Sequence, residues 1–242
     1  MTISRVINFL KEGWANFIGL LYPNLCVSCL EKSLSKDQLL CVLCSIEIPF
    51  TDHFENQENK VVEHFYGRIP IVHGSALLHF AKNSKVRNML YNFKYEGMKE
   101  IGIMLGESLG RKLKESQFFS EIELIIPVPI HNDKRHRRGF NQSEIIAQGL
   151  LQICNIPYAP NVLVKLFDTE TQTHKNRNQR MDNVLNTLGI NNKEKIIGKN
   201  ILLIDDVITT GATLEAAGKI LLENGAQSIS VAVAGVTVND FL

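Results

Sequence analysis

The stretch ILLIDDVITTGAT, residues 201–213, joins an apolar run to two adjacent carboxylates and then to a turn of small and hydroxylated residues. Four consecutive apolar residues are typical of a buried strand in a parallel sheet. Because carboxylates resist burial, we expect this strand to end at Asp205 and Asp206, where the sheet is open to water or to a ligand. The sequence therefore predicts that the chemistry of the protein takes place there.

The turn that follows has the composition of an anion-binding site. Its backbone N–H groups, together with the positive end of the next helix, would hold a phosphate, and Gly211 permits a close approach of the backbone. The two carboxylates, which only accept hydrogen bonds when ionised, suit the vicinal hydroxyls of a ribose. An ordinary turn with capping threonines is the alternative. The candidate ligands of a phosphorylated sugar are Asp205, Asp206, Thr209, Thr210, Gly211, Ala212 and Thr213.

Strands and helices alternate from about residue 69 to the end of the chain. The patterns predict strands at 124–128, 162–167, 200–204 and 228–236, and helices at 84–91, 99–114, 141–154 and 212–223. Continuous apolar strands separated by helices indicate an α/β fold with a parallel sheet flanked by helices. We expect four parts: an amphipathic helix (1–21), a cysteine module (22–50), a linker (51–68) and the α/β domain (69–242).

The composition of the 242 residues, with 45% hydrophobic side chains and a net charge of +1, is that of a globular protein without a general affinity for nucleic acid. No apolar run is long enough to span a bilayer, and polar residues interrupt the N-terminal stretch, so we expect a cytoplasmic protein without stable membrane insertion. The apolar stripe between Ile3 and Leu21 favours packing on the protein itself or on a second subunit. A membrane-surface helix would carry more lysine and arginine.

Four of the five cysteines form two CxxC pairs, Cys26/Cys29 and Cys41/Cys44. Two such pairs can supply four thiolates to one tetrahedral zinc ion, and a closed four-thiolate site is structural rather than catalytic. A redox pair or a set of buried thiols is the alternative, but the paired spacing suits a metal site better. Cys154 fits the apolar face of a helix.

Three segments together resemble a known family. ILLIDDVITTGAT is similar to the phosphoribosyl pyrophosphate (PRPP) motif of type I phosphoribosyltransferases, and residues 127–144 (PVPIHNDKRHRRGFNQSE) resemble the ComF/GntX family. Residues 171–184 (TQTHKNRNQRMDNV) and the four cysteines also resemble this family, so the similarity covers nearly the whole chain. The resemblance implies the type I phosphoribosyltransferase fold, a small zinc module and a role in natural competence, the uptake of DNA in transformation.

The resemblance also implies roles for three loops, each of which follows a strand of the sheet. The loop of residues 169–183 would be the flexible catalytic loop, in which Lys175, Arg177 and Arg180 would close over the leaving pyrophosphate. Mg²⁺ would bind together with PRPP and keep several waters. The basic run after residue 128, with Arg135, Arg137 and Arg138, and the separate Lys94 would contact either pyrophosphate or a nucleic-acid backbone. An ordinary exposed lysine is the alternative for Lys94.

The sequence thus predicts a ComF-like protein that binds PRPP and Mg²⁺ and acts as a phosphoribosyltransferase in competence. The alternative is a non-catalytic competence factor that senses PRPP and binds single-stranded DNA, because one fold serves both enzymes and regulators. PRPP is the expected ligand. Single-stranded DNA, other competence proteins and a second copy of the chain are further candidate partners.

Overall fold

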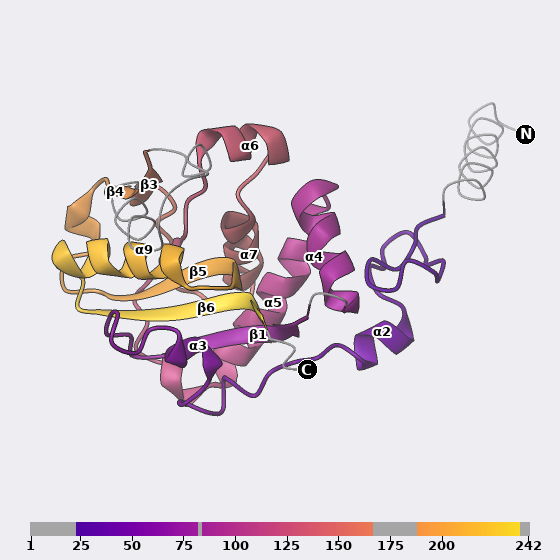
Figure 1. The fold of residues 1–242 in the computed structure, drawn as a ribbon, viewed down its shortest axis with the longest axis horizontal. Coiled ribbons are helices and arrows are strands. Elements are labelled where there is room, and N and C mark those ends of the chain that lie inside the picture. The colour runs from indigo at the N-terminus through magenta and orange to yellow at the C-terminus, as the bar shows by residue number, and fades with distance from the viewer. Residues whose placement is uncertain (1–22, 82–83, 167–187, 238–242) are drawn as a thin grey trace, which may run out of the picture.

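A parallel sheet of four strands forms the centre of the protein. The computed structural model describes residues 23–81, 84–166 and 188–237. Within them, the order of the strands is β1 (Gly74–Phe80), β6 (Ser228–Thr237), β5 (Asn200–Ile208) and β2 (Leu124–Pro127). All three pairings are parallel, so the four carboxyl ends lie on the same side of the sheet (Figure 1). The predicted α/β fold with a parallel sheet is confirmed.

Helices cover both faces of this sheet. One face packs against α4 (Lys85–Tyr95), α5 (Lys99–Glu115) and α7 (Gln142–Leu151), and the other against α3 (Lys60–Glu63) and α9 (Ala212–Glu223). The side chains of β5 alternate between two separate cores, because Leu202 and Ile204 face the first set of helices whereas Ile201 and Leu203 face the second. This double burial explains why the four residues 201–204 of the strand are all apolar.

The remaining elements lie outside the main sheet. They are α2 (Val42–Ile46), η1 (Gln117–Phe119), α6 (Asn132–Arg138), β3 (Leu163–Lys165), β4 (Leu188–Ile190) and η2 (Lys193–Lys195). The strand predicted at 162–167 therefore forms, but β3 pairs antiparallel with β4 in a separate sheet of two strands. The helix predicted within residues 1–21 lies outside the described part of the chain, in which no helix is long and apolar enough to cross a membrane.

The prediction that the strand ends at the two aspartates is wrong. β5 continues to Ile208, with Asp205 opposite Val233 and Val207 opposite Gly235 of β6. The strand continues because β6 offers backbone partners as far as Thr237, so the pairing does not stop where the side chains become polar. The carboxylates are accommodated by hydrogen bonds and an ion pair, which the alternation pattern of a single strand does not reveal.

Two segments predicted as irregular are ordered. The basic run forms α6, with a His131 side chain accepting the N–H of Asp133 at its start and Gly139 in the left-handed region (φ 80°) at its end. This helix has no buried residue, so it lacks the apolar stripe by which a helix is recognised in a sequence. The segment predicted as a linker, 51–68, packs on the protein and buries Phe54 and Phe65. The domain limits themselves stay a prediction.

The outer strands of the sheet are each covered by a crossing segment. On β1, the N–H of Thr51 donates to Leu77 O and the N–H of His79 donates to Pro49 O. On β2, the backbone of Ile125 exchanges hydrogen bonds with Pro157 and Ala159. Single antiparallel and parallel bridges result on the two sides, so neither outer strand presents an uninterrupted row of unpaired groups.

A close contact between two helix backbones fixes the position of α7, whose first turn reaches the carboxyl side of the sheet. A Cβ at Gly106 of α5 would lie 2.0 Å from the carbonyl oxygen of Ile146 on α7. A Cβ at Gly149 of α7 would lie 2.2 Å from the carbonyl oxygen of Ile103. Both distances are far below van der Waals contact, so only glycine permits this approach of the two helices.

We expect Gly106→Ala to lower the free energy of unfolding by about 2 kcal/mol or more, because the added methyl group has to push α5 and α7 apart. Urea denaturation measures the change. Lys114→Ala, at an exposed position of the same helix, is the control and should change the stability by less than about 0.5 kcal/mol. Equal stability of the Gly106→Ala protein and the wild type would contradict the close contact.

Candidate functional site

The two aspartates of β5 are held by partners from three different elements. Asp205 Oδ1 accepts hydrogen bonds from Ser143 Oγ (2.9 Å) and from the backbone N–H of Asp206 (2.8 Å). Lys94, in the last turn of α4, places its Nζ 2.7 Å from Asp206 Oδ2. Ser143 lies in the first turn of α7. The site is thus assembled from one strand and the ends of two helices on the same face of the sheet.

The electrostatics of the two carboxyl groups differ. Burial and the neighbouring charge of Asp206 raise the pKa of Asp205 to about 7, although the hydrogen bonds from Ser143 and from the Asp206 N–H act in the opposite direction. The charge of Asp206 is balanced by the ammonium group of Lys94. A ligand that requires both carboxylates to be ionised therefore has to bind against a proton on Asp205 below neutral pH.

The predicted anion-binding turn lies between β5 and α9, as expected. Gly211 is the N-cap of α9 and has a positive φ of 73°, a conformation that favours glycine. The hydroxyl of Thr210 accepts the N–H of Ala212 (3.4 Å), and both Thr209 and Thr210 are exposed. Residues 207–214 and Asp205 line a shallow hollow of about 40 Å³. The predicted ligand residues of this turn are therefore brought together around one small concavity.

Arg68 contacts the backbone of this turn, and this role was not predicted from the sequence. Its Nη1 donates to the backbone oxygens of Thr210 and His64, both at 2.7 Å, and its Nη2 forms an ion pair with Glu215 in the first turn of α9. Glu215 is 8% exposed, so it requires such a partner. An arginine in a polar connecting segment has no sequence pattern that would indicate a contact with a distant turn. The acidic residue on the buried side of α9 was the only indication in the sequence.

A larger hollow of about 390 Å³ runs along residues 62–71. It shares only Arg68 with the surroundings of the turn, and its other lining residues are mainly apolar. The chemistry-bearing side chains gather at the smaller hollow, and we place the site there.

The basic helix α6 uses most of its predicted contact residues within the protein. Arg135 is bound to both carboxylate oxygens of Glu144 (3.3 Å each). Arg138 donates to Gln142 Oε1 (3.1 Å), and its guanidinium carbon lies 5.5 Å from the centre of the Tyr95 ring. Arg137 is exposed and has no ion pair or hydrogen bond of its side chain within the described ranges. Of the three arginines, Arg137 is thus the one whose guanidinium is available to a phosphate.

The predicted catalytic residues Lys175, Arg177 and Arg180 lie outside the residues that the structure describes. Their role stays a prediction.

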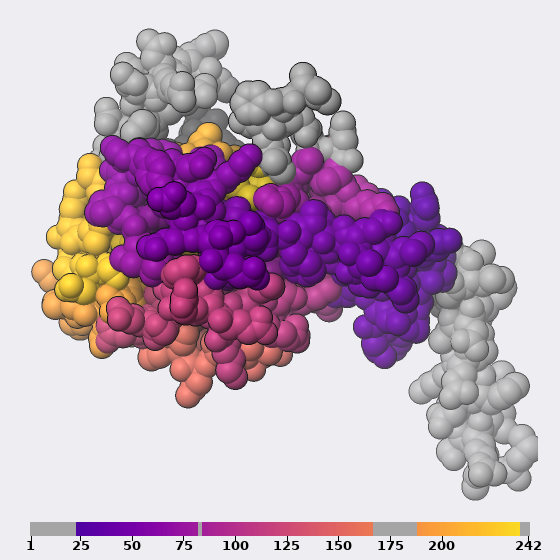
Figure 2. All heavy atoms as spheres, turned by 90° about the horizontal axis from the view of Figure 1, so that it is seen from below, coloured from indigo at the N-terminus to yellow at the C-terminus, as the bar shows by residue number. Residues whose placement is uncertain are grey.

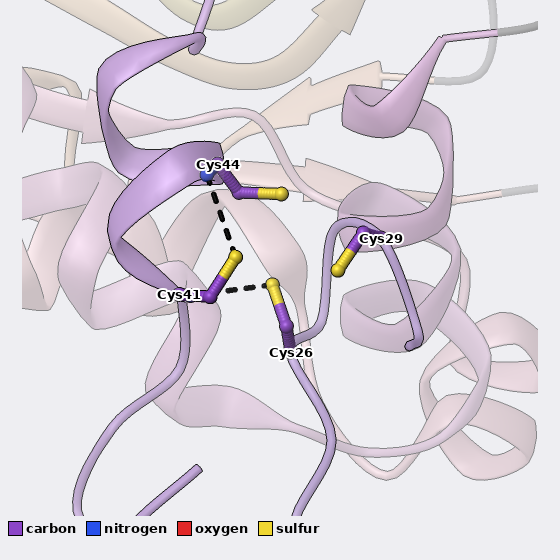
Figure 3. Close-up of side chains that lie close together, drawn as sticks. All are labelled: Cys26, Cys29, Cys41 and Cys44. Carbon is purple, nitrogen blue, oxygen red and sulfur yellow. Dashed lines mark hydrogen bonds between the residues drawn. The ribbon is translucent and has the colours of Figure 1, made fainter. Parts of the chain in front are cut away.

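The four predicted cysteine ligands do come together. Their Sγ atoms all lie within 4.8 Å of one another (Figure 3). The N–H of Cys41 donates to Cys26 Sγ (3.4 Å) and the N–H of Cys44 donates to Cys41 Sγ (3.5 Å). Such bonds stabilise thiolates that bind a metal. The module stands at one end of the described part of the molecule (Figure 2), beyond α4 as labelled in Figure 1.

Two of the four thiols have pKa values shifted in opposite directions. Burial opposes ionisation of Cys26, but hydrogen bonds from the backbone of Cys29 and Cys41 outweigh it and lower its pKa to about 6. Burial raises the pKa of Cys44 to about 12. Four thiolates this close together require a cation to be stable, and the donor set is that of a soft or borderline divalent metal. The residues therefore fit the metal that their spacing predicts.

Comparison with known proteins places the site within a known type of domain. A family model of the phosphoribosyl transferase domain matches residues 136–235, which include α7, β5 and the anion-binding turn. Among solved structures, the chain is similar to the glutamine PRPP amidotransferase of B. subtilis in complex with ADP and GMP, with 20% identity and a TM-score of 0.41. That similarity covers 59% of this chain and 30% of the amidotransferase.

Relatives with similar sequences are named for competence and for the use of DNA. Competence protein F of Haemophilus influenzae is 29% identical over 59% of this chain and 64% of that protein. Competence protein ComFC of Bacillus subtilis is 32% identical over 62% of this chain and 60% of ComFC. DNA utilization protein YhgH of Salmonella typhimurium is 27% identical over 59% of this chain and 63% of YhgH. The chain thus matches less than two thirds of the length of these relatives.

We expect Asp205→Asn to make the protein more stable at alkaline pH. The native pKa of Asp205, about 7, lies above its ordinary value of 3.8, so the folded protein keeps a proton that the unfolded chain releases. The free energy of unfolding of the wild type therefore falls as the pH rises from 3.8 to about 7 and is constant above. The amide side chain of the Asp205→Asn protein does not titrate, so this loss of stability is absent from the variant. Between pH 5 and pH 8 the stability difference between variant and wild type should grow by at least about 1.4 kcal/mol, one pKa unit.

Chemical denaturation at the two pH values tests this expectation. Glu194→Gln, which removes an exposed carboxylate from η2, is the control and should show no such growth. If the stability difference between Asp205→Asn and the wild type is the same at both pH values, Asp205 is ionised in the native protein throughout.

Proposed function

We propose that the chain, as a member of the ComF family with a phosphoribosyltransferase domain, binds PRPP at the carboxyl side of its sheet and transfers the phosphoribosyl group in competence. The observation that carries the proposal is the anion-binding turn, held by Arg68, next to the aspartates of β5. This arrangement combines backbone N–H groups for a phosphate with carboxylates for ribose hydroxyls in one hollow.

Each part of PRPP then has partners of matching chemistry. The 5′-phosphate binds the N–H groups of the turn at the N-terminus of α9, and Asp205 and Asp206 accept hydrogen bonds from the ribose hydroxyls. Arg137 faces the pyrophosphate together with Lys175, Arg177 and Arg180 of the catalytic loop. In the transfer, the bond from C1 of the ribose to pyrophosphate breaks and the lone pair of an acceptor forms the new bond at C1.

Mg²⁺ fits this site as a companion of PRPP rather than as a resident ion. Among the described residues, the cysteines are the only group of three or more metal-ligating side chains close enough to hold an ion. Mg²⁺ would therefore be held mainly by oxygens of PRPP and by water, with at most the aspartates of β5 from the protein. When bound, it would neutralise the charge on the leaving pyrophosphate.

Calorimetric titration with PRPP and Mg²⁺ tests the proposal. We expect Asp206→Asn to weaken PRPP binding about tenfold or more, because a charged hydrogen-bond acceptor is lost. Arg68→Ala should also weaken binding, since the turn loses the group that fixes the carbonyl of Thr210. Arg111→Ala, which removes an exposed ion pair with Glu107 on α5, is the control and should leave the affinity unchanged. Wild-type protein that fails to bind PRPP would refute the proposal.

We further propose that the four cysteines hold one structural zinc ion. Protein purified without added metal should contain about one zinc per chain, because four thiolates at this spacing complete a tetrahedral site. Cys29→Ser should lose most of the metal, whereas Cys154→Ser, outside the cluster, should retain it. Elemental analysis gives the metal content. A zinc-free wild type, or a Cys29→Ser protein with full zinc content, would exclude the assignment.

A second candidate function, binding of single-stranded DNA, is favoured by one specific surface. The rings of Tyr91 and Tyr95 on α4 are 52% and 57% exposed and lie 4.9 Å apart. The guanidinium of Arg138 lies over the Tyr95 ring, and the exposed Arg137 is next to it in the sequence. Exposed aromatic rings beside cations are the combination on which unstacked bases and their phosphates bind.

Titration with single-stranded DNA at several salt concentrations separates the two roles of α6. If Arg137 contacts only pyrophosphate, Arg137→Ala should weaken PRPP binding and leave DNA binding unchanged, and this is the outcome we expect. If it contacts a DNA backbone, Arg137→Ala should flatten the dependence of log K on log salt by roughly 0.7. Tyr91→Ala then weakens DNA binding without changing the slope. Lost DNA affinity with intact PRPP affinity would make the second function the correct one.

A further inference from the structure

One face of α4 is attached to the cysteine module by three polar contacts. Lys85 Nζ lies 2.6 Å from Glu47 Oε2, next to the end of α2. Asn88 Nδ2 donates to the backbone oxygen of Ser28 (2.8 Å), and Asn92 Nδ2 donates to that of Val27 (3.4 Å). The three residues are spaced by three and four positions, so they form one stripe along the helix.

Two of these contacts are made to the loop that the metal would organise. Val27 and Ser28 are the residues between Cys26 and Cys29, and they are only 2% and 4% exposed. Their carbonyl groups accept the hydrogen bonds from α4, and they lie in the same turn of the chain as Cys26 and Cys29, whose side chains are drawn in Figure 3. The position of these carbonyl groups is thus tied to the geometry of the sulfurs.

The same helix carries Lys94 to the proposed PRPP site. Lys94 follows Asn92 by two residues, about 200° around the helix, so it projects away from the cysteine module. Its Nζ lies 2.7 Å from Asp206, with the two side chains 22% and 15% exposed. Buried Met89 and Phe93 hold α4 against the core between these two contacts. A helix is stiff over this length, so a displacement at Asn88 reaches Lys94.

We propose that metal binding by the four cysteines sets the position of Lys94 and thereby the affinity of the site at Asp206 for PRPP. The PRPP part rests on the function proposed above, whereas the coupling from the module to Lys94 does not. With the metal bound, the carbonyls of Val27 and Ser28 hold α4 so that Lys94 neutralises Asp206. When the metal is lost, the loop between Cys26 and Cys29 relaxes, α4 shifts and the balance of charge at the carboxylates changes.

A double-mutant cycle distinguishes this coupling from a general stabilising role of the module. Asn88→Ala removes the hydrogen bond to Ser28 O, and Lys94→Met removes the ion pair with Asp206. We expect Asn88→Ala to change PRPP affinity about threefold or more in the wild-type background and to have no effect in the Lys94→Met background. Arg87→Ala, exposed on the same helix, is the control and should leave the affinity unchanged. Equal effects of Asn88→Ala in both backgrounds would overturn the proposal.

Linkage provides a second, independent readout. If the metal site influences PRPP binding, PRPP must influence the metal site by the same factor. We expect PRPP, in the presence of excess Mg²⁺, to raise the zinc affinity of the wild-type protein about threefold or more and to have no effect on the Asn88→Ala protein. Equilibrium competition with a zinc-selective chelator measures this affinity. Equal zinc affinity with and without PRPP, in protein that binds PRPP, would contradict the coupling.

Protein that binds no PRPP would refute the proposed function, and the coupling would still be tested by melting the four zinc-loaded proteins of the cycle without ligand. In that measurement, the effects of Asn88→Ala and Lys94→Met on the melting temperature should not add, because the two substitutions break one connection. Additive effects would overturn the coupling independently of PRPP.

Discussion

The parallel pairing of β5 with β6 is the constraint on which the site depends. It continues past the apolar residues and through Asp205 to Ile208, so the hydrogen-bonded ladder, and not a free loop, determines where both carboxyl groups lie. A strand fixed by this ladder cannot turn its side chains to water. The charge must therefore be compensated in place, and Ser143, Lys94 and a proton on Asp205 do so. Each helix that supplies a partner is positioned for this purpose by its own packing, α7 by the glycine contact with α5 and α4 by the core and the cysteine module.

The conformation of the predicted anion-binding turn follows from the same arrangement. Because β5 ends only at Ile208, three residues remain before α9, and Gly211 makes the reversal with a positive φ. This turn lines the same hollow as Asp205. Arg68 donates a hydrogen bond to the carbonyl oxygen of Thr210 and so holds the backbone of the turn in place. The backbone of the turn is thereby fixed before any ligand binds, and for the phosphate that we propose to bind there, such preorganisation lowers the entropic cost of binding.

The sequence allowed the prediction of features that depend on local pattern. The parallel sheet follows from double-sided apolar strands, the start of α9 at Ala212 from the Thr-Gly turn, and the cysteine cluster from its spacing. Features that depend on partners far along the chain could not be predicted. Arg68 acts on a turn 142 residues away, and whether Lys94 meets Asp206 depends on how α4 packs. The helix α6 was not predicted because it has no buried residue. The end of β5 was predicted too early because the polarity of a strand does not show how far the neighbouring strand extends.

The segments that cross the two outer strands have a consequence for the behaviour of the protein at high concentration. A parallel sheet of four strands has two sides on which another chain could add a strand, and such addition is a common route to aggregation. Here residues 49–51 occupy backbone groups of β1, and residues 157–159 occupy those of β2. Residues 49–51 and 157–159 therefore hinder the addition of a strand at either side of the sheet. Proteolytic removal of residues up to 51 would expose β1 as a template for strand addition and so favour self-association through it.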